Sequence, residues 1–205
     1  TLAFCMYLPM KGAPFVYEDV RWLGSVHQEI LWTWPSRALT NLTFQVQSEI
    51  PIIFGWPVGP TWFHMLNLVV HLVNSALLAI IAIPMIGRLG AIFASGMFAI
   101  HPLQTEAVSY VAARGDLLLT CCALVALWGL RHGQRGLMVT AGAMILAGWT
   151  KEIGVVVMGL MLWTCLIYRQ HLKLMAYGAG VVALLCLVQW PTFSAWLTLP
   201  ANAGG

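Results

Sequence analysis

Long apolar runs dominate the sequence and limit its possible folds more than any other feature. They lie near 61–84, 86–100, 105–130, 136–150, 153–168 and 173–194, and residues 1–10 read as the end of another. About 20 apolar residues cross a bilayer as a helix, whereas a membrane barrel needs short alternating strands. Of the residues, 60% are apolar and 8% charged, a balance that a water-soluble domain would not tolerate. We therefore predict an all-α polytopic membrane helix bundle of about seven spans.

Residues 11–60 separate the first predicted span from the second and contain no run long enough to cross a membrane. We interpret them as an extracytoplasmic loop. Within it, a helix is expected to follow Pro35 and extend to Glu49, lying in the membrane interface with Trp32, Trp34 and Trp56 as anchors at headgroup level. We treat 1–205 as a single transmembrane module, either a fragment of a longer chain or a minimal version of a larger fold.

The charged residues are sorted by sign along the chain. The breaks after the second, fourth and sixth runs contain only basic residues: Arg88, Arg131, Arg135, Arg169 and Lys173. Such breaks are expected to be cytoplasmic. All the acidic residues fall on the other side: Glu18, Asp19, Glu29, Glu49, Glu106, Asp116 and Glu152. We predict an integral membrane protein, of a bacterial inner (plasma) membrane or an endoplasmic reticulum, whose polar cluster faces the extracytoplasmic side.

The structural interpretation of this cluster pairs each acid with a cation nearby in the sequence. It predicts ion pairs of Asp116 with Arg114 and of Glu152 with Lys151. No basic run suggests nucleic acid. The five cysteines lie in apolar stretches without metal-ligand spacing, so neither a disulfide framework nor a metal site is predicted, and dependence on a divalent metal stays open.

A polar stripe follows one face of the run at 61–84. His64, Asn67, His71 and Asn74 are spaced by three, four and three residues, which brings them to one side of a helix. Hydrogen bonds between helices explain such a stripe in a membrane bundle. Because neutral imidazole can be an axial ligand, a haem- or pigment-binding membrane subunit is a less favoured alternative.

Five short segments carry a resemblance to a known family. In order and spacing they are similar to the membrane part of the transmembrane and tetratricopeptide-repeat O-mannosyltransferases and their bacterial relatives, which belong to the GT-C superfamily. The segments are Phe15–Asp19, Arg37–Phe44, His64–Asn74, His101–Val108 and Thr150–Glu152. The resemblance covers nearly the whole chain. It implies a GT-C-like module with a long first extracytoplasmic loop, which transfers a sugar from a polyprenyl-phosphate carrier to a protein or lipid hydroxyl.

The resemblance also implies roles for individual residues. Glu18 and Asp19, where relatives usually have Asp-Asp or Asp-Glu, match the carboxylates that deprotonate or orient the acceptor hydroxyl. The cations Arg37, Arg114 and Lys151 suit the departing phosphate. The full set expected to bind lipid phosphate or substrate is Arg37, His101, Glu106, Arg114, Asp116, Lys151 and Glu152.

The partners that follow are membrane lipid, the polyprenyl-phosphate sugar donor, and a protein acceptor or other membrane subunits. The main alternative is a catalytically silent scaffold or accessory subunit of a larger membrane complex. Small residues that allow close helix contact, such as Gly136, Gly142 and Gly154, are compatible with that alternative.

Overall fold

The computed structural model describes Tyr7, Pro14 and residues 37–57 and 59–167. Several predictions fall outside these residues. They concern most of the first span, the run at 173–194, the interfacial anchors Trp32 and Trp34, and the catalytic candidates Glu18 and Asp19. The fold and the site below are built from the described part alone.

The described part of the chain is helical and contains no strand, which confirms the all-α prediction there. Its elements are α4 (Ala38–Phe54), α5 (Pro60–Ile100), α6 (Leu103–Ser109), η3 (Val111–Ala113), α7 (Arg114–Leu130), α8 (Gly133–Gly148) and α9 (Gly154–Ile167). By length and composition, two helical stretches within these residues are able to cross a membrane, Pro60–Ile100 and Val111–Leu130. Helix α8 matches the run at 136–150 and is shorter than a full span, and the described part of α9 matches the run at 153–168.

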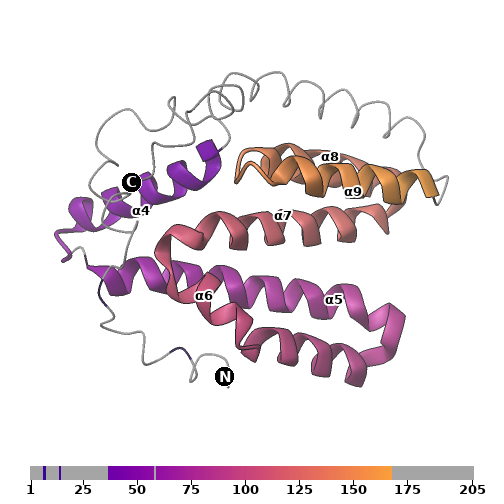
Figure 1. Cartoon of the computed structure of the whole chain (residues 1–205), viewed down its shortest axis with the longest axis horizontal. Helices are drawn as coiled ribbons and strands as arrows, with labels where there is room; N and C mark the ends of the chain where they lie inside the picture. The colour runs from indigo at the N-terminus through magenta and orange to yellow at the C-terminus, as the bar shows by residue number, and fades with distance from the viewer. Residues whose placement is uncertain (1–6, 8–13, 15–36, 58, 168–205) are drawn as a thin grey trace, which may run out of the picture.

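Helix α5 contains two of the predicted runs. A straight helix of its 41 residues would be about 60 Å long, twice the hydrocarbon thickness of a bilayer. Instead the chain turns at Gly87, whose φ of 74° and ψ of 171° are non-helical and favour glycine. The second arm runs back beside the first (Figure 1). The runs at 61–84 and 86–100 are therefore the two arms of a hairpin.

The run predicted as one span over 105–130 is not one continuous helix, and the part of it that is long and apolar enough to cross a membrane is Val111–Leu130. The chain forms the short α6, then η3, and only then α7, with Tyr110 in an extended conformation between them. The Asn67 side-chain amide donates to the carbonyl of Tyr110 at 3.2 Å. A side chain from another helix thus satisfies a backbone group at the break, which a count of apolar residues along the run does not reveal.

The helices pack in sequence order across the molecule: α5 against α7, α7 against α8, and α8 against α9 (Figure 1). Between α7 and α8 the approach is close at Gly129 and Gly136, where a Cβ on either residue would collide with the other helix. Thr140 of α8 donates to the carbonyl of Ala126 on α7 at 3.1 Å. Small residues and one hydroxyl therefore hold this pair together.

The polar stripe of α5 is buried. Asn74 donates to the carbonyl of Leu117 on α7 at 2.9 Å, and Nε2 of His71 lies 3.0 Å from the carbonyl of Ala99 on the second arm. These are the interhelical hydrogen bonds that the spacing predicts. The rings of Tyr7 and Phe98 pack at 5.8 and 5.4 Å from the His71 ring. These contacts explain the burial of His71 by packing within the bundle.

The described charges gather at two ends of the bundle, as the sequence predicts. At one end, Arg131 after α7 donates to the carbonyl of Ile81, close to the turn of α5 that Arg88 follows. At the other end lie the beginning of α4, α6, and the connection between α8 and α9 (Figure 1). Residues distant in sequence meet at this second end, and the candidate site lies there.

Candidate functional site

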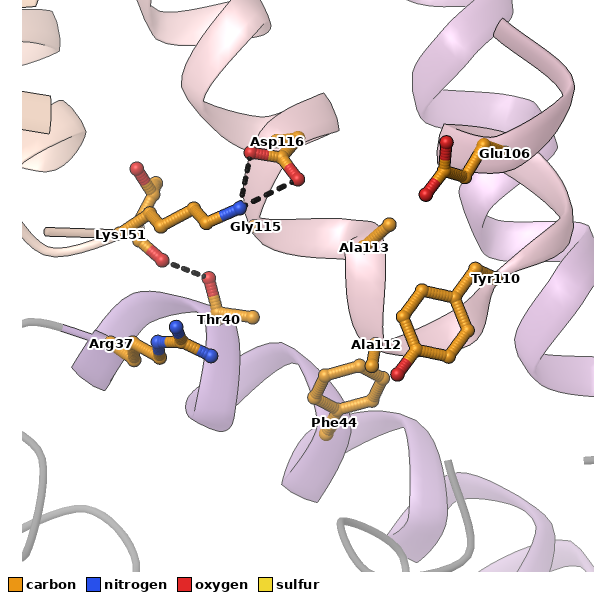
Figure 2. A pocket seen from close by; sticks show the side chains of 11 residues that line it. Arg37, Thr40, Phe44, Glu106, Tyr110, Ala112, Ala113, Gly115, Asp116 and Lys151 are labelled. Carbon is orange, nitrogen blue, oxygen red and sulfur yellow. Dashed lines mark hydrogen bonds and ion pairs between the residues drawn. The ribbon is translucent and has the colours of Figure 1, made fainter. Parts of the chain in front are cut away.

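A cleft of about 230 Å³ lies where α4, α6, the beginning of α7 and the α8–α9 connection meet. Figure 2 shows the side chains around it. Its lining residues are Arg37, Thr40, Phe44, Glu106, Tyr110, Ala112, Ala113, Gly115, Asp116, Thr150 and Lys151. Four of the predicted site residues, Arg37, Glu106, Asp116 and Lys151, are therefore brought together, although they span more than a hundred positions of sequence.

Helix α4 forms one wall and is fixed to the α8–α9 connection at its first turn. Leu39 N–H donates to the carbonyl of Trp149 at 2.9 Å, and the Thr40 hydroxyl donates to the carbonyl of Thr150 at 2.6 Å. Gly115 of α7 meets the same connection, where a Cβ would lie 3.1 Å from the Thr150 carbonyl oxygen. The absence of a side chain at Gly115 thus permits this close contact.

The helix expected to end near Glu49 continues to Phe54 as α4 and also packs on the first arm of α5. Gln47 Nε2 donates to the carbonyl of Trp62 at 2.6 Å, and Trp62 Nε1 donates to the carbonyl of Gln47 at 2.8 Å. With α4 held at both places, Phe44 of this helix and Arg37 directly before it are positioned in the wall of the cleft.

Two ion pairs cross the cleft region. Lys151 Nζ lies 2.7 and 2.8 Å from the two carboxylate oxygens of Asp116. Arg37 donates two hydrogen bonds to the Glu152 carboxylate, of 2.8 Å from Nε and 3.2 Å from Nη2. All four side chains are partly exposed, between 30% and 47%. Each pair therefore contributes little to stability but fixes the geometry of the charged groups.

The predicted local pairs, Asp116 with Arg114 and Glu152 with Lys151, are wrong. Lys151 reaches toward α7 and its neighbour Glu152 reaches toward α4, because successive residues of the connection point to different helices. The ion-pair partners therefore depend on which segments lie close together in the fold and not on distance along the sequence.

Arg114 does not line the cleft and is fully buried. Its Nε donates to Asn67 Oδ1 at 2.9 Å and its Nη2 to the carbonyl of Phe63 at 3.3 Å. The guanidinium carbon lies 3.9 Å from the centre of the Phe44 ring, which separates it from the cleft. Arg114, predicted to bind phosphate, thus lies behind the cleft wall and not in its lining. Its contacts instead connect the beginning of α7 to the polar stripe of α5.

His101 is another predicted site residue that lies elsewhere. It is exposed, and its Nδ1 accepts a hydrogen bond from the backbone N–H of Leu103 at 3.2 Å, at the beginning of α6. The structure gives it a local role at a helix terminus, where such acceptors satisfy otherwise unpaired N–H groups.

Glu106 and Tyr110 form the side of the cleft that α6 provides. The Tyr110 N–H donates to the Glu106 carbonyl at 2.9 Å, which closes the last turn of α6 and keeps the two residues one helical turn apart. Glu106 is exposed and makes no ion pair with any residue that the structure describes. Among the described residues, it contributes a carboxylate without a cationic partner to this side.

Sequence reasoning missed Thr40, Phe44 and Tyr110 as lining residues. Thr40 and Phe44 follow Arg37 by three and seven positions, a helical spacing that could have marked them. For Tyr110 there was no signal, since its place depends on the break after α6. Within the described residues no group of three or more His, Cys, Asp or Glu side chains is arranged to hold a metal ion.

Several known proteins are similar in sequence to this chain. Protein O-mannosyl-transferase Tmtc2 of Drosophila melanogaster is 33% identical over 156 residues, an alignment that covers 64% of this chain and 16% of the relative. Protein O-mannosyl-transferase Tmtc1 of the same organism is 28% identical over 153 residues, which cover 64% of this chain and 17% of the relative. Protein O-mannosyl-transferase TMTC3 of Homo sapiens is 27% identical over 141 residues, with 65% and 14% covered. The chain thus spans about a sixth of the length of these relatives.

No protein-family model and no solved structure matches the chain. The relatives above come from animals, and nothing in them supports the bacterial membrane expected from the sequence. What they do support is the family resemblance carried by the five segments: about two thirds of this chain is similar to proteins named as O-mannosyltransferases.

Proposed function

We propose that the chain is a membrane module of a GT-C-like glycosyltransferase, which transfers a sugar from a polyprenyl-phosphate carrier to a protein hydroxyl. The observation that carries the proposal is the cleft. It joins Arg37 and Lys151, from two separate family-like segments, at one polar end of an apolar helix bundle. A lipid carrier would present its phosphate at such a depth, where helix ends meet the membrane surface.

The charges of the cleft suit a phosphodiester, which carries one negative charge. Lys151 Nζ has three N–H donors, and Asp116 accepts two hydrogen bonds from it. Arg37 presents a planar fork that matches phosphate oxygens. As the sugar–oxygen bond breaks, negative charge grows on the phosphate, and cations fixed beside it stabilise that charge.

The other half of the reaction needs a base, because a serine or threonine hydroxyl is a poor nucleophile. Glu18 and Asp19 are the proposed bases, by their position in the family-like segment Phe15–Asp19. On this proposal the cleft faces the extracytoplasmic side. The carrier requires a membrane, and the exposed apolar side chains of α5, such as Leu89 and Phe93, provide a surface for lipid.

The proposal is tested with the native polypeptide in lipid nanodiscs, polyprenyl-phosphate-linked mannose and an acceptor peptide. Asp19→Asn or Glu18→Gln is expected to reduce transfer by about 10²–10⁴-fold, the usual contribution of a general base. Lys151→Met should weaken donor binding. Arg135→Ala, an exposed cation at the opposite end of the bundle, is the matched control and should leave transfer unchanged. Normal turnover in both carboxylate variants would refute the proposal.

A catalytically silent subunit of a membrane complex is a second candidate, favoured by one observation. Arg37 and Lys151 already carry the carboxylate partners Glu152 and Asp116, so a phosphate must compete for them. This candidate predicts a stoichiometric partner and no bound lipid phosphate. Native mass spectrometry of the complex extracted from its membrane separates the two functions, since a retained polyprenyl-phosphate favours the transferase.

A further inference from the structure

The two sides of the cleft differ in chemistry. One side holds both ion pairs, Lys151 with Asp116 and Arg37 with Glu152. The opposite side consists of Glu106 and Tyr110 from α6, which Figure 2 shows across the cleft from Lys151. A ligand that fills the cleft therefore meets fixed cations at one end, and a carboxylate with an aromatic ring at the other.

The α6 side has the properties of a binding surface for hydroxyl groups. An ionised carboxylate only accepts hydrogen bonds, and its two oxygens can accept from two adjacent donors. A tyrosine combines an apolar ring face with a polar tip, and Tyr110 is a half-buried residue of the cleft lining. Adjacent hydroxyls on a ring with apolar C–H faces match this combination, and a neutral monosaccharide has both.

The described part of the cleft has room for a small ligand. Its volume of about 230 Å³ lies below the ~300 Å³ at which sites for drug-sized ligands begin. One sugar residue is compatible with this volume. The negative charge of Glu106 also disfavours a sugar that carries a carboxylate, because like charges at hydrogen-bond distance repel.

We infer that Glu106 and Tyr110 form the sugar subsite of the cleft, which selects a neutral monosaccharide with adjacent hydroxyls. The inference rests on the proposed function, in which Arg37 and Lys151 hold the phosphate of the same donor. Glu106 accepts hydrogen bonds from the sugar hydroxyls, and the Tyr110 ring packs against the sugar. Neither residue takes part in bond breaking, so both decide which donor binds and how the sugar is oriented.

The test compares two phosphodiester lipids of equal charge, of which only one has a sugar. Binding of polyprenyl-phosphate-linked mannose and of sugar-free polyprenyl methyl phosphate is measured for the native polypeptide in nanodiscs. The unmodified protein should bind the sugar-linked lipid at least tenfold more tightly. In Glu106→Gln this preference should fall to about twofold or less, because hydrogen bonds to a charged group are stronger than those to a neutral amide. The affinity of this variant for the sugar-free lipid should stay unchanged.

Glu49→Gln is the matched control, since Glu49 is an exposed carboxylate of α4 that does not line the cleft. It should retain the preference for the sugar-linked lipid, and Glu106→Asp should restore part of it. In addition, Glu106→Gln should improve binding of a polyprenyl-phosphate-linked uronic acid relative to the unmodified protein.

The outcomes distinguish the subsite from the proposed function. If the unmodified protein binds both lipids equally, or if Glu106→Gln weakens both to the same extent, the sugar subsite is refuted while carrier binding stands. If neither lipid binds to the unmodified protein, the proposed function fails and the subsite fails with it. A Glu106→Gln protein that elutes as an aggregate is replaced by Tyr110→Leu, for which the same loss of preference is expected.

Discussion

Replacing Gly136 by alanine is predicted to disrupt the contact between α7 and α8. A Cβ at this position would lie 2.8 Å from the carbonyl carbon of Gly129 and 3.0 Å from Cβ of His132. Carbon atoms pack best at about 3.5–4.0 Å, so α8 must retreat by about 0.7 Å or more. Because the nearest opposing atoms belong to the Gly129 backbone of α7, no rotation of a side chain relieves the overlap.

The size of the effect follows from two opposing contributions. Overpacking of this kind costs about 1–3 kcal/mol and occasionally more, and the backbone position of the clash places Gly136→Ala at the upper end. Alanine also favours a helix over glycine by about 1 kcal/mol. At Gly142 on the same helix, no atom lies within 4 Å of the position that a Cβ would take, so Gly142→Ala is expected to gain the second contribution alone. The difference between the two variants then isolates overpacking, at about 3 kcal/mol.

The assay is thermal unfolding of both variants in the same detergent, followed by intrinsic tryptophan fluorescence. For a chain of this size, about 3 kcal/mol corresponds to a difference in Tm of about 6–12 °C. Gly136→Ala should melt below the unmodified protein and Gly142→Ala at or above it. Equal melting temperatures for the two variants would show that the close approach of α7 and α8 is not a determinant of stability.

Two further perturbations test the site. Arg114→Met leaves the buried Asn67 Oδ1 without its donor and should reduce the free energy of unfolding by about 1–3 kcal/mol. Adding Asn67→Leu should recover part of this loss. Thermal unfolding of the single and double variants measures both effects. A purely additive cycle would contradict this coupling. A double-mutant cycle of Lys151→Met and Asp116→Asn should give a coupling free energy of about 0.2–1 kcal/mol, which weakens in high salt because both side chains are partly exposed. A coupling free energy that does not change with salt would refute this reasoning.

The sequence by itself determined the helical class and the sorting of charges along the bundle. Both follow from one-dimensional patterns: apolar runs must satisfy their backbone groups within a helix, and breaks in those runs must fall at helix ends. The spacing of Asn67, His71 and Asn74 likewise predicted a buried polar face, because helical periodicity fixes direction without knowledge of the partner helix.

Only the tertiary structure decided which polar groups meet. Arg114 donates a hydrogen bond to Asn67 in the interior, Lys151 pairs with Asp116 and not with its neighbour Glu152, and the run at 105–130 is interrupted at Tyr110. In each case the deciding atoms belong to a segment distant in sequence. An ion pair or a helix break depends on distances of about 3 Å between such segments, and apolar periodicity carries no information on those distances. The cleft, with cations on one side and Glu106 on the other, therefore emerged only when the helices were packed.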